Sequence, residues 1–91
     1  IKANNTFSLY QNIPNPVVRS TKIQFEIFKS GRYNLTVYNM YGFKVKTLFD
    51  QNMPAGKYEV IFDSNDLPVG TYLYRLMDQS DAIVNKLHIL K

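Results

Sequence analysis

Few side chains in this sequence have the types and spacing that chemistry requires. His88 is the single imidazole, and the chain has no Cys, which leaves no thiol site, haem site or disulfide framework. No Ser or Cys is arranged with His88 so that the imidazole would activate a nucleophile, and a position on the surface of a strand explains this residue better. We therefore expect no catalytic residue, no metal site, no cofactor and no enzyme activity.

The oxygen-rich segment Asp63-Ser64-Asn65-Asp66 is a second candidate, because its spacing resembles the start of a calcium-binding loop. The glycine that such a loop needs at its sixth position and the glutamate that it needs at its twelfth are both missing. Asx-turn chemistry in a loop accounts for the same residues. We expect a turn between strands here.

Charge and hydropathy argue against two classes of partner. Lys and Arg number 11 and Asp and Glu number 7, for a net charge of +4. The basic residues are scattered and form no run or stripe of the kind that predicts nucleic-acid binding. The longest apolar runs are triplets such as Val60-Ile61-Phe62. A membrane-spanning helix needs about 20 apolar residues, so none is expected.

Aromatic side chains are the remaining candidates for recognition, since the chain has 7 Tyr and 6 Phe. One small core cannot hold all of Phe28, Tyr38, Tyr41, Tyr72 and Tyr74 together with their alternating neighbours. We expect some of these rings on the surface. A final strand at a sheet edge would also offer unpaired backbone groups to a partner.

Short strands are the elements that would position these residues. Residues 21–28 alternate apolar Ile23, Phe25 and Ile27 with polar neighbours, which is the period of a half-buried strand. Further strands are predicted over residues 7–10, 33–38, 43–48, 58–62, 70–77 and 82–91. The last segment also fits a helical spacing, but its shortness and its β-branched residues favour a closing strand.

Turn residues and prolines separate these strands. Pro14 and Pro16 lack a backbone N–H, so residues 11–16 are expected to cross between sheets or to run along an edge. About seven short strands at this spacing predict an all-β, immunoglobulin-like antiparallel β-sandwich. Residues 7–91 would form this single domain, and residues 1–6 would be the remnant of a linker in a longer protein. The predicted core contains Phe25, Leu35, Val37, Val60, Phe62 and Leu76.

An ordered series of motifs runs through these elements. The motifs are Phe7–Pro16 (FSLYQNIPNP), Ser20–Ile23 (STKI), Leu35–Gly42 (LTVYNMYG), Gly56–Tyr58 (GKY), Leu67–Tyr74 (LPVGTYLY) and Lys86. Together they resemble the type A C-terminal sorting domain of the type IX (Por) secretion system of Bacteroidota, over residues 7–91. The resemblance implies an immunoglobulin-like sandwich that directs its cargo protein across the outer membrane and is then cleaved off.

The resemblance also implies partners, a route and recognition residues. The partners are the outer-membrane type IX translocon, a sortase-like peptidase and an N-terminal cargo domain of the same precursor. The route leads through the periplasm to the cell surface or the extracellular space. The residues carried over are Gly70 and Tyr72 of a Gly-x-Tyr motif, and Lys86 and Lys91 of a terminal motif. On the closing strand, Leu87 and Leu90 would add selectivity beside Lys86.

Two other functions fit the same fold class. An accessory carbohydrate-binding or fibronectin-like module would use Tyr38, Tyr41 and Tyr72 as a coplanar, exposed platform for sugars. A structural domain, such as the immunoglobulin-like part of flagellar hook-capping proteins, would lie inside a longer chain. An exposed row of aromatic rings would favour the first, and the full-length gene would identify the second.

Overall fold

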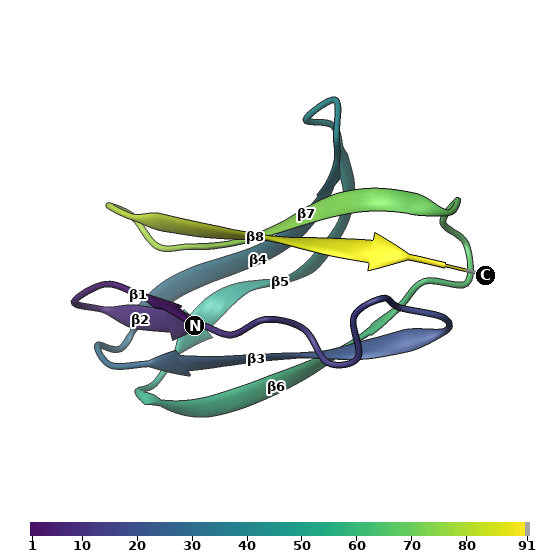
Figure 1. Ribbon diagram of the computed structural model, residues 1–91. Coiled ribbons are helices and arrows are strands. Elements are labelled where there is room, and N and C mark those ends of the chain that lie inside the picture. Colours follow the sequence, from purple (N-terminus) through teal and green to yellow (C-terminus); the bar gives the residue numbers. More distant parts are fainter. Residues whose placement is uncertain (91) are drawn as a thin grey trace.

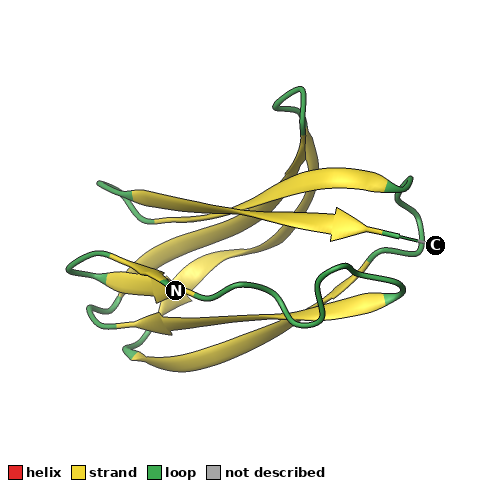
Figure 2. Ribbon diagram, viewed as in Figure 1, coloured by secondary structure: helices red, strands yellow, loops and turns green. Residues whose placement is uncertain are grey.

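The computed structural model describes residues 1–90, which form two antiparallel sheets packed face to face (Figure 1). Sheet A has the strand order β1-β2-β3-β6, and sheet B has the order β5-β4-β7-β8. The strands are β1 (Lys2–Ala3), β2 (Phe7–Leu9), β3 (Ser20–Ile27), β4 (Gly31–Asn39), β5 (Lys44–Met53), β6 (Gly56–Asp63), β7 (Gly70–Met77) and β8 (Ala82–Ile89). Turns and loops connect them (Figure 2), and residues 1–90 contain no helix that could cross a membrane.

The predicted β-sandwich is confirmed, with eight strands where about seven are expected. The additional strand is β1, which pairs with β2. Strand β5 runs to Met53 rather than to residue 48, because its last residues continue to pair with β4 as far as Gly31. Strand β7 has the predicted bounds, and the segment after it forms the strand β8, not a helix. The assignment of residues 1–6 to a linker stays a prediction.

Alternating side chains fill the space between the sheets. In β8, every odd-numbered residue from Ile83 to Ile89 is buried and every even-numbered one is exposed. Phe25 stacks with Phe49 and Tyr58, at centroid distances of 5.3 and 5.4 Å. The predicted core residues Phe25, Leu35, Val37, Phe62 and Leu76 are buried, and Val60 is partly buried against them.

A polar group lies within this apolar core. The Tyr74 hydroxyl donates to the Tyr10 carbonyl (2.8 Å). It accepts hydrogen bonds from the Asn12 N–H (2.9 Å) and from Asn85 Nδ2 (3.3 Å). Burial raises the pKa of Tyr74, so the phenol stays protonated and able to donate. These bonds hold the main chain at residues 10 and 12 against sheet B.

Residues 10–17, which we call the crossing segment, leave sheet A after β2, reach β8 of sheet B at Val17 and lead back to sheet A at β3. They bridge the two sheets along one edge, which agrees with the prediction of a segment that crosses between sheets or runs along an edge. Ile13 bridges to β3, and Val17 pairs in parallel with Ile89 of β8. The Val17 N–H donates to the His88 carbonyl, and the Leu90 N–H donates to the Val17 carbonyl, both at 2.7 Å. The crossing segment therefore runs beside the C-terminal strand (Figure 1).

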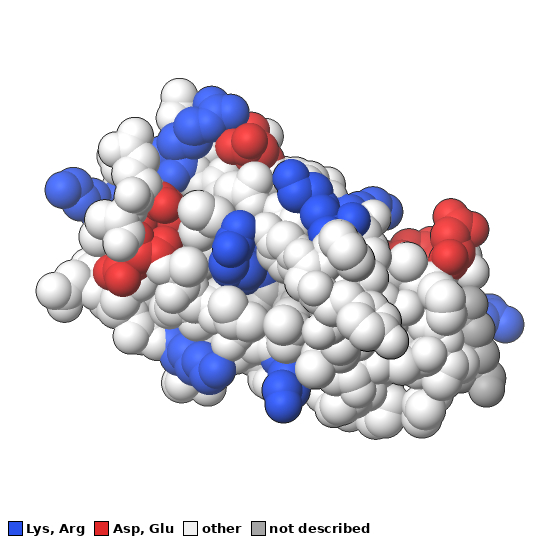
Figure 3. All heavy atoms as spheres, turned by 90° about the horizontal axis from the view of Figure 1, so that it is seen from above, with Lys and Arg blue, Asp and Glu red and all other residues white. Residues whose placement is uncertain are grey.

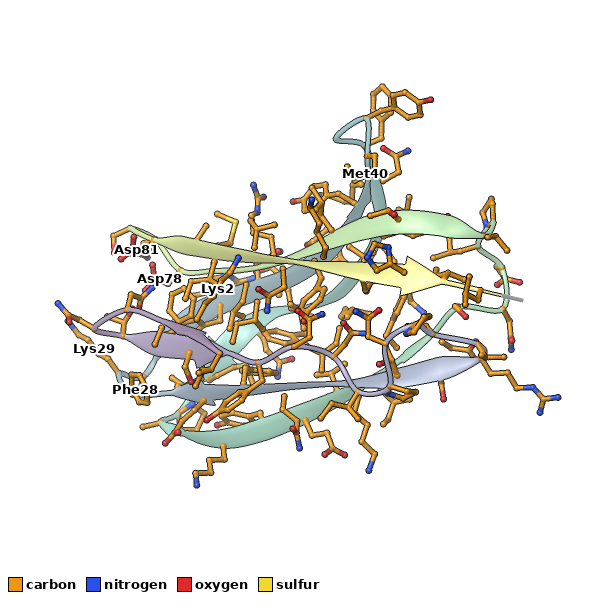
Figure 4. All side chains as sticks on the ribbon, in the orientation of Figure 1. Lys2, Phe28, Lys29, Met40, Asp78 and Asp81 are labelled. Atoms are coloured by element: carbon orange, nitrogen blue, oxygen red, sulfur yellow. The ribbon has the colours of Figure 1, made fainter. Side chains whose placement is uncertain are left out.

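A carboxylate closes the opposite end of the sandwich, where Figure 4 shows Asp78 and Asp81 in the β7–β8 turn. Asp78 accepts hydrogen bonds from the Thr6 hydroxyl (2.9 Å) and from the N–H groups of Ser80 (2.9 Å) and Asp81 (2.7 Å). Burial acts to raise the pKa of Asp78, but these hydrogen bonds outweigh burial and lower it. The ionised side chain thus ties β2 to the turn.

The packing predicts a large cost for truncating Phe62. Phe62→Ala should lower the free energy of unfolding by about 3–5 kcal/mol, because the ring is fully buried. Ile61→Ala, one residue away on the exposed face, is the matched control and should change it by less than about 1 kcal/mol. Urea denaturation measures both. Equal midpoints for the two variants would contradict the facing of β6.

The buried hydroxyl yields a second prediction. Tyr74→Phe leaves the buried Asn12 N–H without its partner and leaves the Tyr10 carbonyl with only the 3.3 Å hydrogen bond from Asn85 Nδ2, so we expect a loss of about 1–3 kcal/mol. The amides of Val17 and Leu90 should also exchange hydrogen faster, because the crossing segment is released. Tyr72→Phe is the control, since its hydroxyl donates only to the Pro68 carbonyl. Unchanged exchange at Val17 would show that the hydroxyl does not hold this segment.

The Asp78 carboxylate predicts a pH dependence of stability. Its folded pKa lies below the unfolded value of about 3.9, so its contribution is complete above that value and is lost as the pH falls through the folded pKa. Denaturant titrations of Asp78→Asn should show a shallower acid loss of stability than the wild type. Asp81→Asn in the same turn is the control. An identical acid profile for Asp78→Asn and the wild type would refute this role.

Candidate functional site

The residues singled out for chemistry lie apart from one another. His88 is on the outer face of sheet B, with Nδ1 2.9 Å from the Thr71 hydroxyl. Asp63 Oδ1 accepts the N–H of Asn65 at 2.9 Å, which confirms the Asx turn. Within residues 1–90, no group of three His, Cys, Asp or Glu side chains is placed to hold a metal ion.

The three tyrosines of the sugar-platform hypothesis do not form a row. Tyr72 is 6% exposed, so its ring belongs to the core. Tyr38 lies against the guanidinium of Arg75, whose Cζ is 4.8 Å from the ring centroid. Tyr41 is in the turn between β4 and β5. Because the three rings occupy different environments, the coplanar platform expected of a binding module is wrong for these residues.

The expected recognition residues divide between the two faces of sheet B. Tyr72 and Leu87 lie opposite each other in the β7–β8 ladder, and both are buried. Lys86 and Leu90 alternate with Leu87 along the final strand and are exposed. The structure therefore brings Lys86 and Leu90 to the outer surface, and places Tyr72 and Leu87 beneath it.

Gly70 is where the chain enters β7. Its φ of 154° is positive and lies in a region that residues with a Cβ rarely adopt. A side chain there would strain the start of the strand and the pairing of Tyr72 behind it. Lys91, the last of the expected recognition residues, lies outside the described residues.

Leu90 belongs to a surface that we call the apolar strip, formed by Val18, Val69 and Leu90. Val69 directly precedes β7 and Leu90 directly follows β8, at the ends of the two strands that pair. Val18 follows Val17, which pairs with the other edge of β8. The three side chains are between 49% and 59% exposed. The chain neighbours Val17 of Val18 and Ile89 of Leu90 are buried, so alternation turns Val18 and Leu90 outward.

Sequence reasoning missed Val18 and Val69. Val18 follows the buried Val17, and Val69 lies between Pro68 and Gly70, so no spacing rule connects them with Leu90. Their common location at the end of β8 depends on the pairing of three segments that are far apart in the sequence. The only local signal is the exposed apolar residue at the end of each segment, and single exposed apolar residues are common.

Lys86 belongs to a row across sheet B. The register places Lys44, Tyr38, Leu73 and Lys86 side by side on β5, β4, β7 and β8. Neither lysine takes part in the ion pairs found among the described residues. Figure 3 looks onto this side of the molecule and shows basic side chains spread over it. The outer face of sheet B thus combines unpaired positive charge with the apolar strip.

The outer edge of β8 is covered by the N-terminal part of the chain. Three side chains bind its outward main-chain groups, and Figure 4 shows one of them, Lys2, reaching from β1 toward β8. The contacts are Lys2 Nζ to the Val84 carbonyl (2.7 Å), Gln11 Nε2 to the Lys86 carbonyl (2.7 Å) and the His88 N–H to Asn15 Oδ1 (3.0 Å). Strand β8 lies at a sheet edge as expected, but the expectation that this edge offers free backbone groups is wrong at these positions.

The chain matches a known protein family. The model of the secretion system C-terminal sorting domain matches residues 11–90, which include the crossing segment from Gln11 onward and strands β3 to β8. A comparison with curated proteins gives no significant match. The family match covers most of the chain and agrees with the β-sandwich and with the motifs along it. The chain therefore belongs to the secretion system C-terminal sorting domains, which are the sorting signals of the type IX secretion system.

Proposed function

We propose that the type IX machinery recognises this domain through the outer face of sheet B, at the end where β7 begins and β8 ends. The contacting groups are the apolar strip and Lys86. One observation carries the proposal: three exposed apolar side chains, Val18, Val69 and Leu90, each adjoin a residue of the segments that pair at Ile89. Membership in the family gives the general role, which is export of an attached cargo to the cell surface or the extracellular space.

The composition of this face supports a protein partner. Exposed apolar residues are usually scattered singly, whereas contiguous ones bordered by polar groups mark interaction sites. Lys86 lies on the same face as Leu90, without an ion-pair partner among the described residues. A partner with an apolar contact surface and a nearby carboxylate would satisfy both features.

The covered edge of β8 favours recognition through side chains. A partner that added a strand to β8 would first have to displace Lys2, Gln11 and Asn15 from its main chain. It would also have to break the pairing of Val17 with Ile89. A partner that contacts Lys86 and the apolar strip leaves all these bonds intact.

The remaining recognition residues act as positioning residues in this proposal. Tyr72 and Leu87 are buried opposite each other and fix the register of β8, so that Lys86 and Leu90 point outward. Gly70 permits the backbone conformation at the start of β7. Their substitution would change sorting by deforming the face.

The route and the final cleavage complete the proposal. The precursor passes through the periplasm and is bound there by the outer-membrane translocon. A sortase-like peptidase then separates the domain from its N-terminal cargo. In this scheme the domain is a ligand of the translocon and a substrate of the peptidase, and it contributes no catalytic residue.

Double substitutions on each of the two sheets test which face the type IX machinery recognises. Lys86→Ala with Leu90→Ser, in a fusion to a reporter cargo, should reduce surface display about tenfold or more, as a loss of about 1.4 kcal/mol of binding would. The cargo should accumulate in the periplasm. Lys57→Ala with Ile61→Ser, at exposed positions of β6, is the matched control and should leave display unchanged. Thermal unfolding of both double variants should stay close to that of the wild type.

The same experiment can contradict the proposal. Normal display of the Lys86 and Leu90 variant, in a folded domain, would exclude this face as the recognition surface. Gly70→Val should lower both display and unfolding temperature, which distinguishes a positioning residue from a contact. Deletion of residues 82–91 is less informative, because it also removes Leu87 and Ile89 from the core.

A further inference from the structure

The hairpin between β4 and β5 projects from the sandwich and ends in exposed apolar side chains. Met40, Tyr41 and Phe43 are 54%, 87% and 70% exposed. Figures 1 and 4 show the hairpin standing above sheet B, with Met40 labelled at its end. None of the three belongs to the core, so the fold does not explain their apolar character.

Asn39 fixes the shape of this tip. Its Oδ1 accepts hydrogen bonds from the N–H groups of Tyr41 (2.9 Å) and Phe43 (3.0 Å). Its own N–H donates to the Phe43 carbonyl (2.9 Å), and its carbonyl accepts the N–H of Gly42 (3.0 Å). Gly42 supplies the positive φ of 87° that the turn requires. A turn held by four hydrogen bonds presents its side chains to the outside instead of letting them collapse onto the domain.

Positive charge lies directly behind the tip. Lys44 and Lys46 are exposed, and neither takes part in an ion pair found within residues 1–90. Residues 39–47 contain no Asp or Glu. Aromatic and apolar side chains followed by lysines have the chemistry of segments that enter the interface of an anionic bilayer. The rings would lie at the level of the headgroups and the lysines beside the lipid phosphates.

We infer that this hairpin tip docks the domain onto an anionic phospholipid surface. A stable protein interface buries about 800 Å² on each partner, which is more than one turn can present. Shallow contact with a membrane needs only a few apolar side chains together with basic ones, and it is weak and reversible. The tip projects from the same outer face of sheet B that carries Lys86. Its residues are not among those proposed to contact the translocon, so the inference does not rest on how the translocon recognises the domain.

A single tryptophan can report this contact, because the chain has no Trp of its own. Tyr41→Trp places the probe at the tip, and Ile61→Trp places it at a 56% exposed position of sheet A. With vesicles of phosphatidylcholine and phosphatidylglycerol, the emission of Tyr41→Trp should move to shorter wavelength and that of Ile61→Trp should not. The shift should weaken in pure phosphatidylcholine vesicles and at high salt, because the lysines contribute through charge.

Sedimentation with the same vesicles tests the residues themselves. Phe43→Ser, and Lys44→Gln with Lys46→Gln, should each weaken vesicle binding about tenfold or more, with an unchanged unfolding temperature. The Lys57→Ala and Ile61→Ser variant of sheet A should bind like the wild type.

Three results would overturn the inference. These are no emission shift at saturating vesicles, an equal shift for both probes, and full binding by the tip variants. If the tip variants lost binding to an outer-membrane protein while the wild type ignored vesicles, the tip would belong to a protein partner and the membrane assignment would be wrong.

Discussion

A phenol hydroxyl buried between two sheets must find hydrogen-bond partners, and Tyr74 finds them on the main chain of residues 10 and 12. This requirement draws the N-terminal chain inward from sheet A. The chain can then pair with the end of β8 through Val17 and place polar side chains along the outward edge of that strand. The buried Tyr74 hydroxyl thus helps to determine how the N-terminal segment packs against the C-terminal strand β8.

For recognition, the consequence is that different groups of β8 have different roles. Its odd-numbered residues build the core, its even-numbered ones form part of a surface, and its outward main chain is bound to the domain itself. A recognition signal on such a strand depends on the folded domain, because the same strand also contributes residues to the core. Side chains such as Lys86 and Leu90 can vary in chemistry without disturbing the core, whereas Leu87 cannot.

The strands could be predicted because alternation is a local property of the sequence. The facing of β3 and the bounds of β7 follow from spacing and turn residues alone. The apolar strip could not be predicted, since Val18 and Val69 meet Leu90 only through long-range pairing. Asn85 is a polar residue on the buried face of β8, and it is tolerated because its amide donates to the Tyr74 hydroxyl opposite it and to the Tyr10 carbonyl. The end of β5 likewise depends on where β4 begins, since Met53 pairs with Gly31.

The parallel pairing of Val17 with Ile89 also determines how the domain responds to force. The segment that leads back toward the cargo and the C-terminal strand run in the same direction. A pull on the N-terminal side, resisted at the end of β8, would therefore load this bridge in shear instead of peeling the two segments apart. In this shear geometry the hydrogen bonds between them are loaded together, not one after another. The pairing is suited to transmitting tension while the signal remains folded.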